Sequence, residues 1–368
     1  MQAAKVGWGI LGTAQIARKN WRGIATSGNA TIAALASRDK ERSQRFIREC
    51  QAEAPLEAPP LAFGSYEELL NCKAVEAVYI PLPTGLRKEW VLQAAAAGKH
   101  VLCEKPCAVN VADLAEMLDA CRRNSVQFMD GVMFMHSKRL ERMRQILDDR
   151  ERFGTVRRIT SSFSFRAEPD FFHSNIRTKS QLEPHGCVGD LGWYCIRLAL
   201  CAMNWQMPRQ VTGRILSQSG PDKASLSVPT EFSGELFFEN GISAGFYCSF
   251  ITDNQQWAVI SGTNGYVNLQ DFVLPFIGHD LSFEVCKADF RMSGGNFEMV
   301  PQVQRVRVEE PSHGKSGSQE SNLFRNFSEQ MRSGGLNSFW PEIALKTQKV
   351  MCASLDSARN QSRPVELG

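Results

Sequence analysis

Hydrophobic residues in the first third of the chain recur in two alternating patterns. Short apolar runs of strand length are followed by segments with an apolar residue at every third or fourth position, the spacing of an amphipathic helix. The predicted strands are Val6–Leu11, Thr31–Ala36, Ala77–Ile80, Val101–Cys103 and Val126–Met129. The first predicted helix follows the turn after the first strand and runs through Ile24. The other predicted helices are Lys40–Cys50, Tyr66–Leu70, Leu86–Ala97 and Asn110–Asn124. Such alternation predicts an α/β fold with a doubly wound parallel (Rossmann) sheet, which we assign to residues 1–130.

The pattern changes near residue 130, where strict alternation of apolar and polar residues becomes common. After a predicted helix at Ser137–Asp149, the expected strands are Thr155–Arg166, Gln210–Ser217, Glu231–Phe238, Ile242–Phe250, Trp257–Ser261, Tyr266–Leu269, Phe283–Cys286 and Val303–Val308. Strands without intervening helices form antiparallel sheets, and Asn240-Gly241 is a two-residue hairpin signal. Residues 131–368 are thus predicted to form an α+β domain with an open, mostly antiparallel sheet. We expect a mobile loop at Pro311–Ser321 and two closing helices, Asn322–Arg332 and Pro341–Arg359, the last of which can pack back on the first domain.

Composition and charge exclude several classes of protein. A length of 368 residues predicts two domains. The 42 basic and 39 acidic residues leave a formal charge of +3, and so small a net charge argues against a nucleic-acid-binding or membrane-surface protein. The eleven cysteines lack the regular spacing of a disulfide framework, so we expect reduced thiols. The absence of an export signal or a membrane span favours a cytoplasmic protein. The six histidines show no metal-ligand spacing, so no metal site is predicted.

The first strand runs into a turn that is typical of dinucleotide-binding sites. Residues 12–17 read G-x-A-x-x-A, a degenerate form of the glycine fingerprint. Gly12 permits the tight turn, Ala14 lets a pyrophosphate approach the backbone, and the phosphates would lie at the helix amino terminus. The predicted cofactor contacts are Gly12, Thr13, Ala14, Gln15 and Ile16. An ordinary close-packed turn is the alternative interpretation.

The end of the second strand bears on the identity of the dinucleotide. Many NAD sites have an acid there to accept from the ribose 2′-hydroxyl, whereas this chain offers Ser37 and Arg38 first. A hydroxyl and a guanidinium would bind a 2′-phosphate, so NADP is predicted, with NAD as the alternative. Asp39 can serve either as the ribose acceptor or as the cap of the helix that follows.

Two further strand ends carry candidate chemistry, because ligands of open α/β sheets bind outside the carboxyl ends of the strands. Pro81 stiffens one of these loops, so that Thr84 can be held against a nicotinamide ribose; a plain turn is the alternative. The other strand ends in Glu104-Lys105-Pro106, which makes Lys105 the first catalytic candidate and Glu104 a candidate cofactor contact. A solvated loop charge is the alternative for Lys105.

One segment interrupts the strands of the second half. Residues 185–198 begin with glycines and continue as a helix, on which Asp190 and Tyr194 are four residues apart and share a face. A carboxylate and a phenol at one point suit proton transfer to a carbinol oxygen, provided that a cation such as Lys105 lowers the phenol pKa. Alternatively, Asp190 caps the helix and Tyr194 is a core aromatic residue.

Four segments resemble the motifs of one family. They are, in order, GILGTAQIA, YIPLPTGLRKEW, HVLCEKP and GDLGWYCI. Together they are similar to the glucose-fructose oxidoreductase, inositol dehydrogenase and MocA (Gfo/Idh/MocA) family, over nearly the whole chain. MFMHSKRL, ERFGTVRRI and GDLGWYCIRLAL are most similar to the branch near the NADP-linked xylose and trans-dihydrodiol dehydrogenases.

The resemblance implies an NAD(P)-dependent dehydrogenase or reductase that acts on CH–OH groups of a sugar, cyclic polyol or dihydrodiol. Hydride would pass between nicotinamide C4 and a carbinol carbon. Lys105 would position the substrate hydroxyl or relay its proton, and Tyr194, beside Asp190, would be the general acid or base. Sheets of this family commonly pair between copies, which implies a homodimer or a larger homo-oligomer.

Two positions depart from the family pattern. Relatives commonly carry Leu-Pro-Asn-x-x-His where this chain has Thr84 and Arg87, which changes the groups available to substrate or ribose. The nominated substrate contacts, all in the second half of the chain, are Arg166, Phe172, Arg177 and His185.

A non-catalytic dinucleotide-binding regulator is the competing hypothesis, because the family includes a transcriptional repressor partner that keeps the fold. The joint presence of Lys105, Asp190 and Tyr194 favours the enzyme. The sharpest expectation is spatial: Lys105 and Tyr194 should meet beside the nicotinamide.

Overall fold

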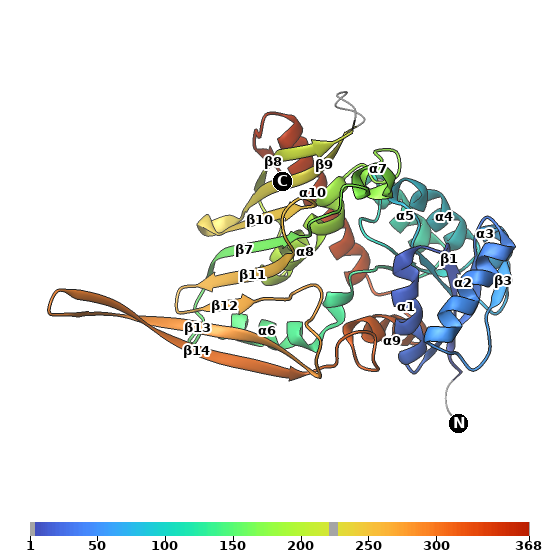
Figure 1. Cartoon of the computed structure of the whole chain (residues 1–368), viewed down its shortest axis with the longest axis horizontal. Helices are drawn as coiled ribbons and strands as arrows, with labels where there is room; N and C mark the ends of the chain where they lie inside the picture. The colour runs from blue at the N-terminus through green and yellow to red at the C-terminus, as the bar shows by residue number, and fades with distance from the viewer. Residues whose placement is uncertain (1–3, 221–226, 368) are drawn as a thin grey trace. The chain divides into compact units, whose positions relative to one another are not determined.

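The computed structural model describes residues 4–220 and 227–367, which divide into two compact units (Figure 1). The first unit comprises the residues up to Ser137, Lys179–Pro184 and His313–Lys349. The second comprises Lys138–Thr178, His185–Ser312 and the residues from Val350 onward. The segments Lys179–Pro184 and His313–Lys349 therefore belong to the same unit as the amino-terminal residues, although they are far from them in sequence.

The first unit contains a six-stranded sheet in which every pair of neighbouring strands is parallel, in the order β3-β2-β1-β4-β5-β6. Its strands are β1 (Val6–Leu11), β2 (Ala30–Ala36), β3 (Leu61–Phe63), β4 (Ala77–Ile80), β5 (His100–Cys103) and β6 (Phe128–Asp130). The predicted doubly wound parallel sheet is confirmed. Only β3 lacks a counterpart among the predicted strands, because three residues at a sheet edge, none of them fully buried, carry no periodic signal.

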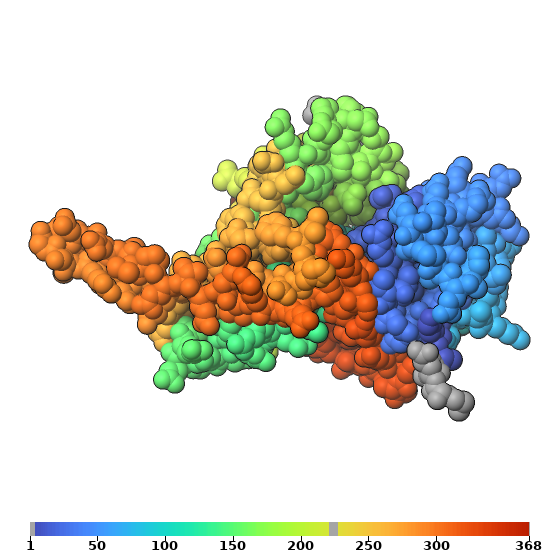
Figure 2. Space-filling view, turned by 60° about the horizontal axis from the view of Figure 1, so that its bottom comes forward, coloured from blue at the N-terminus to red at the C-terminus, as the bar shows by residue number. Residues whose placement is uncertain are grey.

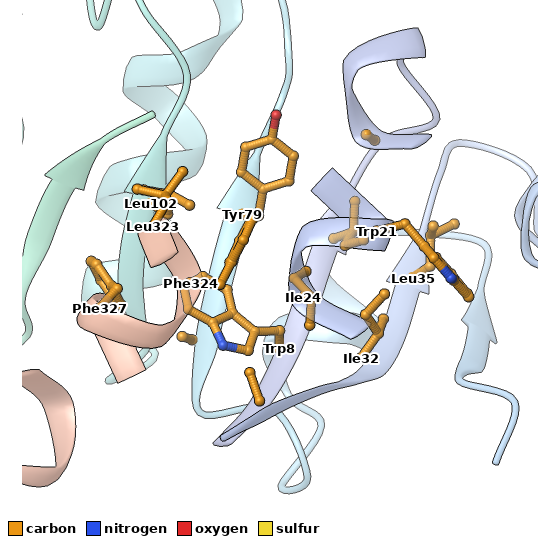
Figure 3. Packing of buried hydrophobic residues seen from close by; sticks show 14 of the residues in the cluster. Trp8, Trp21, Ile24, Ile32, Leu35, Tyr79, Leu102, Leu323, Phe324 and Phe327 are labelled. Atoms are coloured by element: carbon orange, nitrogen blue, oxygen red, sulfur yellow. The ribbon is translucent and has the colours of Figure 1, made fainter. Parts of the chain in front are cut away.

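Helices connect these strands and cover the sheet. They are α1 (Gln15–Thr26), α2 (Lys40–Glu53), α3 (Tyr66–Leu70), α4 (Thr84–Ala96), α5 (Val111–Arg123), the 3₁₀ turn η1 (Met133–His136) and, from the far end of the sequence, α9 (Gln319–Arg332). Figure 3 shows how α9 completes the core: Phe324 lies edge-on to Trp8, with 5.0 Å between ring centroids, and Phe327 lies beside it. The indole Nε1 of Trp8 donates a 3.2 Å hydrogen bond to Ser328 Oγ.

The start of α9 corrects the loop predicted at Pro311–Ser321. Ser318 caps the helix by accepting a hydrogen bond from the backbone N–H of Ser321, so the last three residues of the predicted loop are helical. Residues 318–321 are also almost completely buried. The serine-rich composition that suggested a loop instead supplies the helix cap.

Helices α1 and α9 approach each other closely at Gly23. A Cβ atom at this position would lie 3.0 Å from the carbonyl oxygen of Glu320, so a larger residue would force the backbones apart. The same contact holds an ion pair, because Lys19 Nζ lies 2.8 Å from Glu320 Oε1. Burial alone would raise the pKa of Glu320, but Lys19 outweighs it and the pKa falls below its usual value.

The second unit contains a nine-stranded sheet in the order β14-β13-β12-β11-β7-β10-β9-β8-β15. Its strands are β7 (Val156–Ser164), β8 (Gln210–Ser219), β9 (Val228–Phe237), β10 (Ser243–Ser249), β11 (Gln255–Gly262), β12 (Tyr266–Leu269), β13 (Asp280–Ser293), β14 (Asn296–Glu309) and β15 (Val365–Glu366). The mostly antiparallel sheet is confirmed, but β7 and β10 pair in parallel. Asn240-Gly241 lies in a three-residue turn between β9 and β10 rather than in the predicted two-residue turn, since the Phe238 N–H bonds to the Ile242 carbonyl.

Helical segments of the second unit lie between its first strands and at its end. They are α6 (Lys138–Asp148), α7 (Phe171–Ser174), the 3₁₀ turns η2 (Ile176–Thr178) and η4 (Glu239–Gly241), the π-helical turn η3 (Val188–Gly192), α8 (Trp193–Ala202) and α10 (Phe339–Arg359), which begins in the first unit. Glycine permits close packing where η3 begins. Gly186 has φ +51°, and a Cβ atom there would lie 2.1 Å from the carbonyl oxygen of Pro229. The glycines before α8 therefore seat η3 on the sheet.

We predict that Lys19→Met lowers the free energy of unfolding by about 2 kcal/mol at pH 7, because it leaves the buried Glu320 carboxylate without its cation. Glu320 stabilises the native protein above its unfolded pKa, and this contribution is lost as the pH falls through the lowered native pKa. The difference between wild type and variant should therefore shrink towards pH 4 in urea titrations. Lys19→Met/Glu320→Gln should recover part of the loss, and a pH-independent difference would contradict the assignment.

Candidate functional site

The turn between β1 and α1 has the features that a dinucleotide pyrophosphate needs. Gly12 adopts φ +114°, a conformation that favours glycine, and a Cβ atom there would lie 3.2 Å from Leu82. Helix α1 begins after Ala14, which is extended and supplies no side-chain cap. No side chain of the cap residue therefore accepts hydrogen bonds from the first N–H groups of this twelve-residue helix. These N–H groups can bind a phosphate instead.

The end of β2 presents two arginines. Arg38 is exposed, and Arg42, four residues later on α2, donates from Nε to Thr13 Oγ1 at 2.7 Å. Arg42 thus connects the end of β2, where the 2′-phosphate is predicted to bind, to the turn after β1. The sequence reasoning missed Arg42, although a basic residue in the first turn of the helix after Arg38 lies near the same strand end.

Ser37 and Asp39 have structural partners beside these arginines. The Ser37 hydroxyl is buried, donates to the Asp39 carbonyl at 2.6 Å and accepts from Ser43 at 2.9 Å. The Asp39 carboxylate accepts from the Glu41 N–H and caps α2, which is one of the two roles that the sequence left open.

Glu104 supports the turn that carries Lys105. Its carboxylate is buried, accepts a 2.5 Å hydrogen bond from the Tyr79 hydroxyl and accepts the Lys105 backbone N–H at 3.2 Å. Burial, with the neighbouring carboxylate, raises the pKa of Tyr79 well above its ordinary value, so Tyr79 remains a donor. Lys105 is partly exposed at the end of β5, and its peptide bond to Pro106 is cis. The Glu104 side chain therefore points into the protein towards Tyr79, whereas the Lys105 side chain is partly exposed.

Arg87 joins three loops of the first unit. This buried guanidinium donates to the Leu82 carbonyl at 2.6 Å, to Thr84 Oγ1 at 3.0 Å and to the Pro106 carbonyl. Its Nη2 also lies 3.8 Å from the Glu183 carboxylate. We call this arrangement the Arg87 cluster: Leu82, Thr84, Arg87, Pro106 and Glu183.

Thr84 is committed to the same cluster. Its hydroxyl donates to Glu183 Oε2 at 2.5 Å, and its backbone N–H donates to Glu183 Oε1 at 3.0 Å. Thr84 is 1% exposed, and Pro81 in the preceding loop is also buried. The two departures from the family pattern therefore bind the segment Lys179–Pro184 to the loop that carries Lys105.

In the second unit, Asp190 lies inside the π-helical turn η3 rather than at a helix cap. Its Oδ2 accepts a 2.7 Å hydrogen bond from Arg177 Nε, and the two side chains form an ion pair. π-Turns within helices are frequent at functional sites. Arg177 was predicted as a substrate contact; the structure pairs it with a predicted catalytic residue.

Tyr194 lies in the first turn of α8. Its side chain is 6% exposed and lies edge-on to Phe163, with 5.7 Å between ring centroids. This packing holds the ring in place and agrees with the interpretation of Tyr194 as a core aromatic residue. The role of its hydroxyl group stays a prediction. Lys105 belongs to the first unit and Tyr194 to the second, so their meeting beside the nicotinamide stays a prediction.

The other nominated substrate contacts differ in burial. Arg166 is exposed, Phe172 is half-buried and lies edge-on to Phe171, and His185 is buried immediately before η3. A separate hollow of 1110 Å³ lies between α6 and the strands β11 to β14, with Arg142, Tyr266 and Met299 in its lining. None of the predicted site residues lines it.

Within the part of the chain that the structure describes, no three His, Cys, Asp or Glu side chains gather as a metal site would require. Among those same residues, no helix has the length and apolar content to cross a membrane.

Comparison with family sequence profiles identifies both units. Residues 6–132 match the profile described as "Oxidoreductase family, NAD-binding Rossmann fold", and residues 140–268 match "GFO/IDH/MocA C-terminal domain". The chain belongs to the Gfo/Idh/MocA oxidoreductase family. It is therefore an NAD(P)-dependent dehydrogenase or reductase.

Individual relatives agree with this assignment. D-xylose 1-dehydrogenase (NADP⁺) 2 of Haloferax volcanii is 34% identical over 70% of this chain and 74% of the relative. Trans-1,2-dihydrobenzene-1,2-diol dehydrogenase of Mus musculus is 31% identical over 73% and 75%. The resemblance to the Gfo/Idh/MocA branch that contains these two enzymes is confirmed.

Solved structures show the same fold. An aldose-aldose oxidoreductase from Caulobacter crescentus superposes with a TM-score of 0.79 at 21% identity, over 99% of this chain and 100% of the other. A 3-ketoreductase from Actinomadura kijaniata superposes with a TM-score of 0.77 at 22% identity, over 98% of each chain.

We predict that Arg87→Met lowers the free energy of unfolding by about 3 kcal/mol, because it leaves two backbone carbonyls buried without their donor and the Glu183 carboxylate without its cation. Arg87→Met/Glu183→Gln should recover part of that loss. The matched control is Lys88→Met on the same helix, whose ion pairs with Asp113 and Glu116 are partly exposed and should matter little. Equal losses in the two single variants, measured by urea denaturation, would contradict the role of the cluster.

Proposed function

We propose that the protein is an NADP-dependent oxidoreductase that transfers a hydride between nicotinamide C4 and a carbinol or carbonyl carbon of a sugar, a cyclic polyol or a dihydrodiol. The observation that carries this proposal is that the chain contains both a dinucleotide turn with Lys105, in one unit, and the Arg177–Asp190 pair with Tyr194, in the other. The relatives named above, which act on xylose and on a dihydrodiol, support the substrate class.

Arg38 and Arg42 support NADP over NAD. Two guanidinium groups four residues apart would bind the doubly charged 2′-phosphate, and each would form charge-assisted hydrogen bonds to it. Asp39, which would accept from a 2′-hydroxyl in an NAD site, is occupied as the cap of α2. Gly12 to Ile16 would hold the pyrophosphate.

Tyr194 is the proposed general acid and base. When bound, the dinucleotide supplies the hydride donor or acceptor at nicotinamide C4. In the reductive direction, the Tyr194 hydroxyl would give its proton to the developing alkoxide; in the oxidative direction, the phenolate would take the proton of the carbinol. A nearby Lys105 ammonium would lower the pKa of the phenol and orient the substrate oxygen.

Asp190 and Arg177 would orient the substrate relative to the Tyr194 hydroxyl. The Arg177–Asp190 ion pair would contact a substrate hydroxyl next to the reacting carbon. Arg166, Phe172 and His185 are the remaining candidates for substrate contacts. A polyhydroxylated substrate would use several of these groups.

We further propose that the protein works in the cytoplasm as a homodimer or larger homo-oligomer. The eleven free cysteines suit a reducing compartment. A second candidate function, a non-catalytic dinucleotide-binding regulator, is supported by the commitment of Thr84 and Arg87 to the Arg87 cluster, which removes two groups that relatives offer to ligands.

We predict NADPH oxidation or NADP reduction with at least one member of a panel of aldoses, ketoses, inositols and dihydrodiols. Lys105→Ala and Tyr194→Phe should each lower kcat by about 10²- to 10⁴-fold, because each removes proton transfer or its electrostatic support. The matched control, Tyr266→Phe on β12 of the second sheet, should retain full activity. Tight NADPH binding without turnover on the whole panel would support the regulator instead.

We predict that Arg38→Ala and Arg42→Ala each weaken NADPH binding by about tenfold or more, the loss of one charge-assisted contact to phosphate. Binding of NADH should change little, because NADH lacks the 2′-phosphate. Arg48→Ala, further along α2, is the control. Fluorescence titration of both nucleotides measures the effect, and equal losses for NADH and NADPH would exclude a 2′-phosphate contact.

A further inference from the structure

Tyr66 lies at the edge of the first sheet where the dinucleotide is proposed to bind. It is the first residue of α3, which Ser65 caps by accepting a hydrogen bond from the Glu68 N–H. The preceding strand β3 pairs in parallel with β2, with Phe63 opposite Ala36. The carboxyl ends of the two strands therefore lie side by side, and ligands of open α/β sheets bind outside such ends. Helices α2 and α3, which follow these strands, both reach the surface of the first unit, in the blue part of the space-filling view (Figure 2).

The ring of Tyr66 is held so that its hydroxyl group lies beside the turn between β1 and α1. Trp90 of α4 packs edge-on against the ring, with 4.7 Å between centroids and 79° between planes. A Cβ atom on Gly12 would lie 3.7 Å from the Tyr66 hydroxyl oxygen and 3.2 Å from Leu82. Because Gly12 contributes no side-chain atom to this space, a ligand bound at the turn can approach the hydroxyl group.

The hydroxyl group of Tyr66 is not used within the protein. It has no hydrogen-bond partner among the residues that the structure describes, although the side chain is partly withdrawn from solvent. By contrast, Tyr79 donates to Glu104 and Tyr247 donates to Glu231. A tyrosine hydroxyl group that is withdrawn from water usually finds a partner, so the Tyr66 hydroxyl is available to a ligand.

The ionisation of Tyr66 makes this hydroxyl group a donor. Burial raises the pKa of Tyr66 above its ordinary value, and this effect outweighs the opposing effect of the Arg38 and Arg42 guanidinium groups. The phenol therefore stays protonated at neutral pH and can donate a hydrogen bond to an anion.

The charged groups that act on Tyr66 are both cations. Arg38 and Arg42 lie close enough to affect its ionisation, and Arg42 is fixed beside the same turn by its hydrogen bond to Thr13. Two guanidinium groups and a protonated hydroxyl group match a phosphate monoester, which has two negative charges and three terminal oxygens that accept hydrogen bonds. In NADP, that monoester is the 2′-phosphate of the adenosine ribose.

We propose that Tyr66 is a further cofactor-binding residue, whose hydroxyl group donates a hydrogen bond to the 2′-phosphate of NADP beside Arg38 and Arg42. Tyr66 thereby adds to the discrimination against NAD, which has a hydroxyl group in place of this phosphate. This inference rests on the proposed NADP specificity and not on the proposed proton transfer.

The test uses Tyr66→Phe, which removes the hydroxyl group and keeps the ring that packs against Trp90. The probes are adenosine 2′,5′-bisphosphate and AMP, which differ only in the 2′-phosphate, together with NADPH and NADH, all measured by titration calorimetry. Tyr66→Phe should weaken binding of adenosine 2′,5′-bisphosphate and NADPH by about tenfold, the loss of one hydrogen bond to a charged group, and should leave AMP and NADH little changed. The matched control, Tyr266→Phe, removes a hydroxyl group from the second unit and should change none of these affinities. Circular dichroism checks that both variants are folded.

Two outcomes would overturn the Tyr66 contact alone. Equal losses for the nucleotides with and without the 2′-phosphate would assign the hydroxyl group to the ribose or the pyrophosphate, and unchanged affinities would exclude it from the cofactor site. In both cases, a wild type that binds adenosine 2′,5′-bisphosphate more tightly than AMP would leave the proposed NADP specificity standing. A wild type without that preference would overturn both proposals. None of these measurements depends on turnover.

Discussion

The buried guanidinium of Arg87 is the constraint on which the candidate site of the first unit depends. It satisfies the carbonyls of Leu82 and Pro106 and faces Glu183, which in turn accepts both donors of Thr84. A buried arginine is tolerated only when its N–H groups are paired, and here the partners come from three separate loops. Moving any one of these loops would leave a charge or a carbonyl without a partner, so the turn that carries Lys105 is held in one position.

This arrangement explains what the departures from the family pattern accomplish. Thr84 and Arg87, which stand where the resemblance implies an Asn and a His, are here engaged in contacts within the protein. Glu104 works in the same way from the interior, since Tyr79 and the Lys105 backbone N–H occupy its two oxygens. Lys105 is thus presented by a turn whose other polar groups are already satisfied.

The second unit fixes its half of the candidate site by packing. Glycines seat the π-helical turn on the sheet, the Arg177 guanidinium holds the Asp190 carboxylate, and Phe163 holds the Tyr194 ring. The proposed acid and base belongs to this unit, whereas the proposed cation, Lys105, belongs to the other.

The sequence by itself determined the parallel sheet, the dinucleotide turn and the strand end at Lys105, because periodicity and turn glycines are local properties. It also determined the family, because four ordered motifs cannot easily recur by chance. Only the tertiary structure decided that Asp39 caps a helix, that Arg42 reaches Thr13 and that Thr84 and Arg87 bind Glu183, a residue about a hundred positions away. It also placed α9 in the first core and β7 beside β10 in parallel, since such contacts depend on which surfaces meet after the chain has folded, and no local pattern records them.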